Sequence, residues 1–133
     1  VLPGGGEHVL VVDDEVSVGR FAGVRLEQLR YRVSVFNDPL RALAAVRAAP
    51  HAFQAIVADF AMPGLTGVEL VRQARTVRPN LPAVIVTGNR GAITPGQHES
   101  VAGAQILDKP FTGDDLVRAL QSVLPVRAAA RQR

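Results

Sequence analysis

Five side chains that can carry out chemistry lie at or just beyond the ends of short apolar runs: Asp13, Asp14, Asp59, Thr87 and Lys109. Three carboxylates that come close together repel one another, and a divalent cation with oxygen ligands, such as Mg²⁺, relieves that repulsion. A carboxylate can also attack phosphorus to form an acyl phosphate, while a metal ion, an ammonium and a hydroxyl stabilise the charge on the transferred oxygens. We therefore expect a Mg²⁺-dependent phosphoryl acceptor in which Asp59 takes the phosphoryl group.

Each of these residues also has a purely structural explanation. Asp13 and Asp14 could favour the positive end of a helix, and Asp59 could stabilise a turn. Thr87 could simply end a strand, and Lys109 could be a solvated surface charge. We prefer the functional interpretation because one shared site accounts for all of these strand ends at once.

The apolar runs have the length of buried strands, and helical patterns separate them. The expected strands cover residues 9–12, 31–36, 55–59, 83–87 and 104–107, and the expected helices lie within 18–29, 39–47, 67–77, 92–103 and 113–124. This alternation predicts a doubly wound α/β fold, in which helices cover both faces of a parallel sheet. The carboxyl ends of such strands share one edge of the sheet, where the five side chains should converge.

The helical patterns make further local predictions. Phe21 and Val77 continue apolar faces and are expected to point toward the sheet. Residues 66–69 have the pattern of a capping box. The fourth helix is expected to be short or frayed because Pro95 and Gly96 weaken its start.

The composition describes one globular domain. The chain has 133 residues, of which 47% are apolar and 20% charged, and it lacks cysteine, which excludes disulfides and thiolate metal ligands. No apolar run approaches the roughly 20 residues that span a bilayer, and no signal-peptide pattern opens the chain. We therefore expect a cytoplasmic domain that does not itself contact a membrane, whereas membrane association of a parent protein stays open.

The net charge of +3 comes mainly from fourteen scattered arginines, with Lys109 as the single lysine. No basic cluster with interleaved aromatic residues is present, so no direct nucleic-acid binding is expected. Because every other basic side chain of this kind is arginine, the single lysine indicates that position 109 requires a compact ammonium group.

The sequence around these side chains resembles response-regulator receiver domains, the phosphoacceptor modules of two-component signalling. The resemblance rests on VVDDE at 11–15, DFAMP and the following turn at 59–67, VTG at 86–88 and LDKPF at 107–111. It implies a flavodoxin-like strand order 2-1-3-4-5 with five helices. It also implies that a histidine kinase or histidine phosphotransferase domain is the partner that phosphorylates Asp59.

The same resemblance implies a role for each site residue. Asp14 and Asp59 would bind Mg²⁺ directly, Asp13 through water, and Ala61 through its backbone carbonyl. Lys109 would contact the phosphoryl group.

Thr87 would turn toward the phosphoryl group and move the face formed by the fourth helix, the fifth strand and the fifth helix, which could also support a weak homodimer. Family members often carry an aromatic switch residue where this chain has Ile106. A muted output change is therefore expected.

Two other classes of function stay open. A metal-dependent phosphatase with an Asp nucleophile commonly needs a second acid two residues later, where this chain has Ala61. A receiver-like interaction domain that is not phosphorylated would be expected to lack an acidic or lysine position.

The expected organisation is a linker at residues 1–6, a receiver domain at 7–124 and a flexible tail at 125–133. The sequence around 6–12 and 61–67 resembles receivers at the C-terminal end of hybrid sensor histidine kinases. This is the context that we expect, with a stand-alone or transcription-factor receiver as the alternative.

Overall fold

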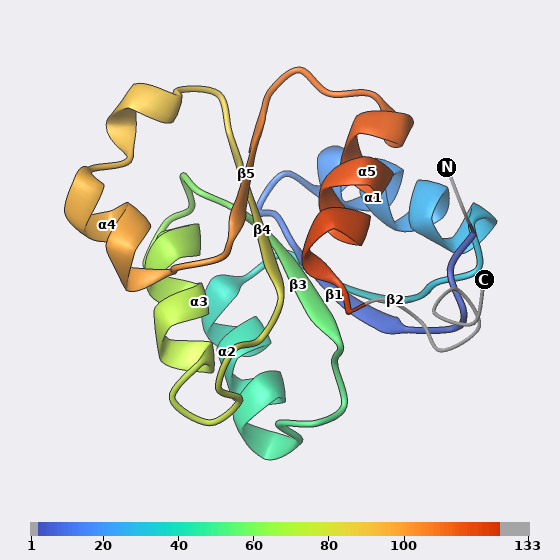
Figure 1. Ribbon diagram of the computed structural model, residues 1–133, viewed down its shortest axis with the longest axis horizontal. Coiled ribbons are helices and arrows are strands. Elements are labelled where there is room, and N and C mark those ends of the chain that lie inside the picture. Colours follow the sequence, from blue (N-terminus) through green and yellow to red (C-terminus); the bar gives the residue numbers. More distant parts are fainter. Residues whose placement is uncertain (1–2, 126–133) are drawn as a thin grey trace.

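The apolar runs form five parallel strands in one sheet, which Figure 1 shows at the centre of the computed structural model. The structure describes residues 3–125. The strands are β1 (His8–Val12), β2 (Arg32–Phe36), β3 (Ala55–Asp59), β4 (Ala83–Thr87) and β5 (Gln105–Asp108). Their order in the sheet is β2-β1-β3-β4-β5, which confirms the predicted doubly wound fold and strand order.

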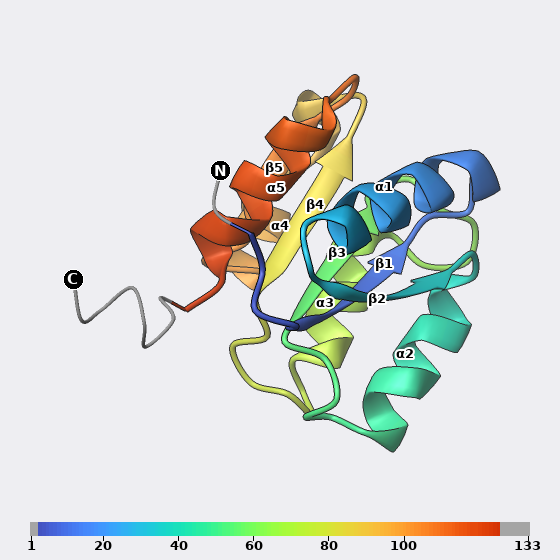
Figure 2. The ribbon, with the colours of Figure 1, turned by 90° about the vertical axis from the view of Figure 1, so that its right-hand side faces the viewer.

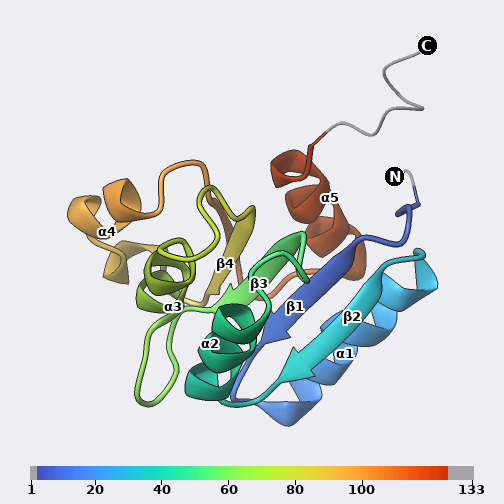
Figure 3. The same cartoon turned by 90° about the horizontal axis from the view of Figure 1, so that it is seen from below.

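Helices cover the two faces of this sheet as two separate layers (Figures 2 and 3). One layer consists of α1 (Val16–Gln28) and α5 (Gly113–Val123); the other consists of α2 (Pro39–Ala48), α3 (Gly67–Ala74) and α4 (Pro95–Ser100). A short 3₁₀ helix, η1 (Arg90–Ala92), follows β4.

Alternate residues of each strand enter the two different cores. Val9 and Val11 pack in the core beneath α1 and α5, whereas Leu10 and Val12 pack in the core beneath α2 and α3. Because both faces of the sheet are covered, the strands read as continuous apolar runs rather than as alternating ones.

The capping box predicted at the start of α3 forms only one of its two hydrogen bonds. Thr66 accepts a hydrogen bond from the backbone N–H of Glu69 at 3.1 Å, but the Glu69 carboxylate accepts from Arg72 and Gln73 instead of returning to the cap. The predicted capping box at 66–69 is therefore only half formed. The arginine three residues along competes successfully for this carboxylate because it offers charge as well as hydrogen bonds.

The fourth helix is short, as predicted, but Pro95 is not what weakens its start. Thr94 and Gln97 form a complete capping box, and Pro95 occupies the first turn, where it has no intrahelical bond to lose.

Two apolar side chains that were predicted to be buried are exposed. Phe21 is 47% exposed because α1 faces the sheet through Gly19, Gly23 and neighbouring small side chains. A Cβ atom at Gly23 would lie 2.9 Å from Val35, so the helix packs too closely to the sheet for a ring at its centre. Val77 lies beyond the end of α3 and is 36% exposed.

The predicted terminal segments are described only in part. Within residues 3–6, the backbone N–H groups of Gly4 and Gly6 donate to the carbonyls of Leu29 and Arg30 at 2.6 and 2.9 Å, and Gly4 packs against the ring of Tyr31. The predicted tail at 125–133 lies outside the described residues except for Pro125. Among the helices of residues 3–125, none is long and apolar enough to cross a membrane.

The two-layer packing predicts contrasting effects of one substitution at two positions of α2. Leu43 is 3% exposed and Leu40 is 58% exposed. Leu43→Ala should lower the free energy of unfolding by about 2–5 kcal/mol because it leaves a cavity in the core. Leu40→Ala should change it by less than about 0.5 kcal/mol. Urea denaturation followed by circular dichroism measures both; equal losses would contradict the packing described above.

Candidate functional site

All five predicted side chains end or follow strands at one edge of the sheet, and the charged groups of four of them converge. The Lys109 ammonium lies 3.1 Å from Oδ1 of Asp59 and 4.0 Å from Oδ2 of Asp13. One carboxylate oxygen from each of Asp13, Asp14 and Asp59 lies within 4.8 Å of the other two. The predicted convergence of three carboxylates and one ammonium is thus present.

The site has a buried floor and an exposed side. Asp13 and Asp59 are each 5% exposed and Thr87 is 3% exposed, whereas Asp14 lies in the open. A ligand that approaches this edge from solvent would therefore contact the exposed Asp14 first and the buried Asp59 at the bottom of the site.

Backbone contacts hold Asp13 in place at the end of β1. Its N–H donates to the carbonyl of Phe36, and its own carbonyl accepts from the Asn37 side chain at 2.9 Å. Its Oδ1 accepts from the backbone N–H of Glu15 at 2.9 Å, which leaves Oδ2 directed to the side of Lys109.

The start of α3 packs directly against the backbone of Asp59. A Cβ atom at Gly67 would overlap the carbonyl oxygen of Asp59, and the Gly67 N–H donates to the carbonyl of Phe60 at 3.0 Å. Glycine at this position is therefore required for the close approach that fixes the end of β3. In the sequence, Gly67 was only the last residue of a motif, and nothing there indicated this contact.

Thr87 contributes to the site through its backbone as well as its hydroxyl. Its carbonyl accepts from the N–H of Lys109 at 2.8 Å, and its Oγ accepts from the N–H of Asn89 at 3.0 Å. The hydroxyl keeps its own proton to donate. Within residues 3–125 the Thr87 hydroxyl makes no hydrogen bond to Asp59 or to the Lys109 ammonium.

Burial sets the protonation behaviour of the two inner carboxyls. Removal from water raises the pKa of Asp59 above its usual range, and the hydrogen bond and charge of Lys109 oppose this only in part. The pKa of Asp13 is also raised, mainly by burial and further by the charge of Asp59, although the N–H of Glu15 opposes the rise. Burial lowers the pKa of Lys109, but its hydrogen bond to Asp59 and the nearby carboxylates outweigh this, and the net shift is upward.

The donor set suits a hard divalent cation. Three carboxylate oxygens within 4.8 Å of one another, with one of the carboxylates open to water, match the preference of Mg²⁺ for a few carboxylate ligands plus retained water. Ala61 lies exposed in the bend after β3, and its backbone carbonyl as a ligand stays a prediction.

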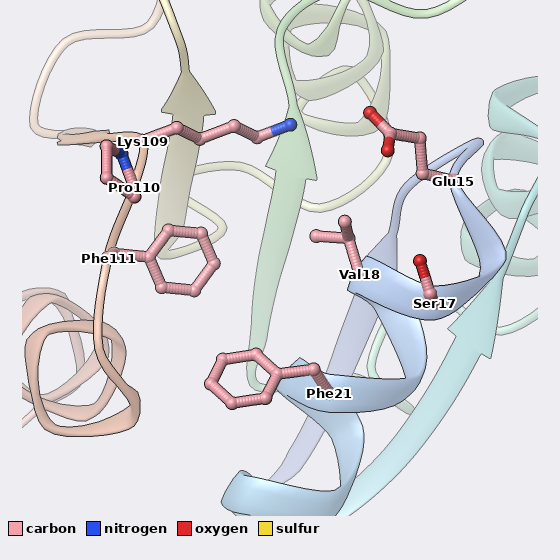
Figure 4. Close-up of a pocket in the computed structure, with 7 residues that line it drawn as sticks. All are labelled: Glu15, Ser17, Val18, Phe21, Lys109, Pro110 and Phe111. Carbon is pink, nitrogen blue, oxygen red and sulfur yellow. The ribbon is translucent and has the colours of Figure 1, made fainter.

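A groove of about 550 Å³ runs from the site along the junction of α1 and the segment after β5. Figure 4 shows Lys109 extending toward Glu15 at one end and the rings of Phe21 and Phe111 further along. The two ring centroids lie 6.2 Å apart. Phe21 was predicted to lie in the core from its helical spacing, and only its exposed ring in the structure reveals that it borders the site.

The fold and the site together define a receiver domain of the response-regulator type. Residues 9–121 match the response regulator receiver domain family, and the chain belongs to that family. This confirms the resemblance that the acidic, threonine and lysine motifs indicated.

Individual relatives place the chain more closely. It is 28% identical to the response regulator receiver protein CpdR of Brucella abortus, over 89% of this chain and 97% of that protein. It is 31% identical to the transcriptional regulatory protein ZraR of Klebsiella oxytoca, over 90% of this chain but only 27% of that protein. Among solved structures, the chemotaxis protein CheY4 of Vibrio cholerae is 30% identical with a TM-score of 0.78, over 89% of this chain and 98% of that one.

The raised pKa of Asp13 predicts that its charge destabilises the free protein. In the unfolded chain an aspartate has a pKa of about 3.9. The folded carboxyl titrates at higher pH. Stability linked to this group is therefore fully present below the unfolded value and is lost as the pH rises through the folded value. Asp13→Asn should be more stable than the natural chain at pH 7, and the difference should vanish at low pH.

Thermal unfolding over a pH series measures this difference, with Glu99→Gln as the matched control because Glu99 is exposed on α4. A natural chain that is the more stable of the two at pH 7 in metal-free buffer would contradict the electrostatic account.

Proposed function

We propose that this chain accepts a phosphoryl group on Asp59 from the phosphohistidine of a histidine kinase or histidine phosphotransferase domain. The observation that carries the proposal is the position of Asp59, buried at the strand edge with the Lys109 ammonium at 3.1 Å and two further carboxylates beside it. A phosphatase with an Asp nucleophile is less well supported because Ala61 stands where its second acid is needed.

The reaction requires one bond to form and one to break. A carboxylate oxygen of Asp59 attacks phosphorus, the new O–P bond forms as the N–P bond breaks, and the electron pair returns to the nitrogen of the imidazole. Asp59 must be ionised to attack, and the ammonium of Lys109 favours that form. After transfer, Lys109 can remain paired with a phosphoryl oxygen, because the group carries more charge than the carboxylate did.

The other site residues have matching roles. Asp14 and Asp59 would hold Mg²⁺ directly, with Asp13 through water and the Ala61 carbonyl as a further ligand. When bound, the metal neutralises charge on the phosphoryl oxygens. The Thr87 hydroxyl accepts a hydrogen bond from Asn89, so its own proton can be donated to a phosphoryl oxygen.

The partner has to cover the groove beside the site. Because Asp59 is only 5% exposed, a histidine ring can reach it only if the partner lies over this edge of the sheet. There it would meet the exposed apolar side chains of Val16, Phe21 and Val24 on α1, of which Phe21 lies next to Phe111. We propose that an apolar surface around the partner's histidine packs on these side chains.

The domain context is proposed from the relatives. The expected hybrid-kinase context has no support from CpdR, CheY4 or ZraR, which are a receiver protein, a chemotaxis protein and a transcriptional regulator. A stand-alone or transcription-factor receiver, with the receiver unit at residues 7–124, is therefore the better-supported proposal. The weak homodimer through α4, β5 and α5 stays a prediction.

Phosphorylation can be tested without any partner protein. Incubation with acetyl phosphate and Mg²⁺ should add the mass of one phosphoryl group, measured on the intact chain by mass spectrometry. Asp59→Asn should abolish the adduct because an amide oxygen is a poor nucleophile, and chelation of the metal should slow its formation by at least about tenfold.

Glu99→Gln provides the control, since this exposed carboxylate lies on α4 away from the site. A natural chain that takes up no phosphoryl group would exclude the proposed function and leave a receiver-like interaction domain as the better description. An adduct that persists in Asp59→Asn would assign the acceptor elsewhere.

The proposed packing of the partner on the apolar side chains of α1 predicts that Phe21 affects transfer from a protein donor but not from a small one. Phe21→Ser should slow phosphoryl transfer from a phosphorylated histidine partner by roughly 30-fold, as expected for loss of an aromatic side chain central to an interface. The reaction with acetyl phosphate is the internal reference because this small donor does not need the protein surface.

Leu40→Ser is the matched control for this experiment. Leu40 is also exposed, at 58%, but it lies on α2, on the other face of the sheet. Equal transfer rates for the two variants would place the partner on a different surface.

A further inference from the structure

An ion pair ties the loop after β4 to the edge strand β5, next to the site. Nε of Arg90 donates to Oδ1 of Asp108 at 3.1 Å, and Nη2 donates to Oδ2 of Asp108 at 2.9 Å. The same Nη2 also donates to the backbone carbonyl of Ile106 at 3.1 Å. One guanidinium therefore holds a side chain and a backbone group of the same strand.

This ion pair closes a ring of contacts around Thr87. On one side, the N–H of Asn89, the residue before Arg90, donates to the Thr87 hydroxyl. On the other side, the N–H of Lys109, the residue after Asp108, donates to the Thr87 carbonyl. The Lys109 ammonium thus belongs to the residue next to Asp108, and the Thr87 hydroxyl accepts from the residue next to Arg90.

The geometry is one that a planar guanidinium satisfies and an ammonium does not. Two parallel N–H groups meet the two carboxylate oxygens, and a further hydrogen bond reaches the strand backbone. The hydrogen bonds from Arg90 hold the pKa of Asp108 below its usual range, so the pair stays charged under ordinary conditions. Both side chains are more than half exposed, so charge alone would contribute little, and the fixed fork is what gives the contact its effect.

We propose that Arg90 and Asp108 are positioning residues that hold the Thr87 hydroxyl and the Lys109 ammonium in the arrangement needed for phosphoryl transfer to Asp59. The inference rests on the proposed function for its chemical consequence. Ile106 fits this account, because its side chain is buried and apolar while its carbonyl receives the bond from Arg90. The charged pair thus adds a surface link between Arg90 and β5 to the backbone hydrogen bond that joins Lys109 to Thr87.

The test uses the rate of phosphorylation by acetyl phosphate with saturating Mg²⁺. Arg90→Gln and Asp108→Asn should each slow the reaction by about fivefold, because small displacements of positioning groups reduce the fraction of reactive geometries. Arg90→Lys should recover only part of the rate, since it keeps the charge but not the fork. The double variant with Arg90→Asp and Asp108→Arg should be faster than either charge-removing single variant.

The control is Arg25→Gln, which removes another Arg–Asp ion pair, Arg25 with Asp114 through one hydrogen bond at 2.6 Å, between α1 and α5. A second readout is amide hydrogen exchange by NMR at Asn89 and Lys109, whose N–H groups donate to Thr87. Both amides should exchange faster in Arg90→Gln, return toward the natural rate in the charge-swapped variant, and stay unchanged in Arg25→Gln.

The outcomes separate this inference from the proposed function. If the natural chain is phosphorylated and Arg90→Gln reacts at the same rate, the positioning role is wrong whatever the exchange shows. If the natural chain takes up no phosphoryl group, the proposed function fails, and exchange alone decides the contact. In that case faster exchange that the charge swap reverses supports the positioning of Thr87 and Lys109, and unchanged exchange overturns it.

Discussion

The concentration of negative charge at one edge of the sheet is the constraint on which the structure of the site depends. Asp13 and Asp59 are buried, Asp14 lies beside them, and Lys109 is the cation that contacts the inner two. Burial raises the pKa of both inner carboxyls, and the single ammonium, which faces three carboxylates, opposes that rise only in part. The free site therefore has surplus negative charge, which a divalent cation would relieve.

The sheet makes this unfavourable arrangement possible by placing the charges on rigid backbone. β1, β3 and β4 are buried on both faces, so the residues at their ends cannot move apart to relieve the repulsion. Gly67 allows α3 to begin against the Asp59 carbonyl, and Asn37 holds the Asp13 carbonyl. The stability of the two cores thus holds the repelling carboxylates close together, and an arrangement of this kind is typical of functional sites.

The sequence predicted what depends on local pattern and missed what depends on distant contacts. The two helix layers and the meeting of the carboxylates with Lys109 follow from apolar periodicity and from parallel-sheet geometry, whereas the strand order was predicted from the resemblance to receiver domains. Phe21 was misassigned because its helical spacing is compatible with burial, and only the close glycine contact of α1 with β2 turns it outward. The Arg90–Asp108 pair joins residues 18 positions apart through side-chain directions that no spacing rule specifies.

The residues that form the acidic site are buried or rigidly held, whereas the residues beside it, such as Phe21 and Arg90, are exposed. Changes to the buried charges or to the strands beneath them alter stability and reactivity together, because those groups share contacts with the core. Phe21 and Arg90 are exposed, and exposed substitutions usually change stability by less than about 0.5 kcal/mol. Such positions can therefore vary without unfolding the domain, while Phe21 borders the approach to Asp59 and Arg90 borders the turn at Thr87. Under the proposed function, partner choice and reaction rate can thus be tuned from the surface while the acidic edge stays fixed.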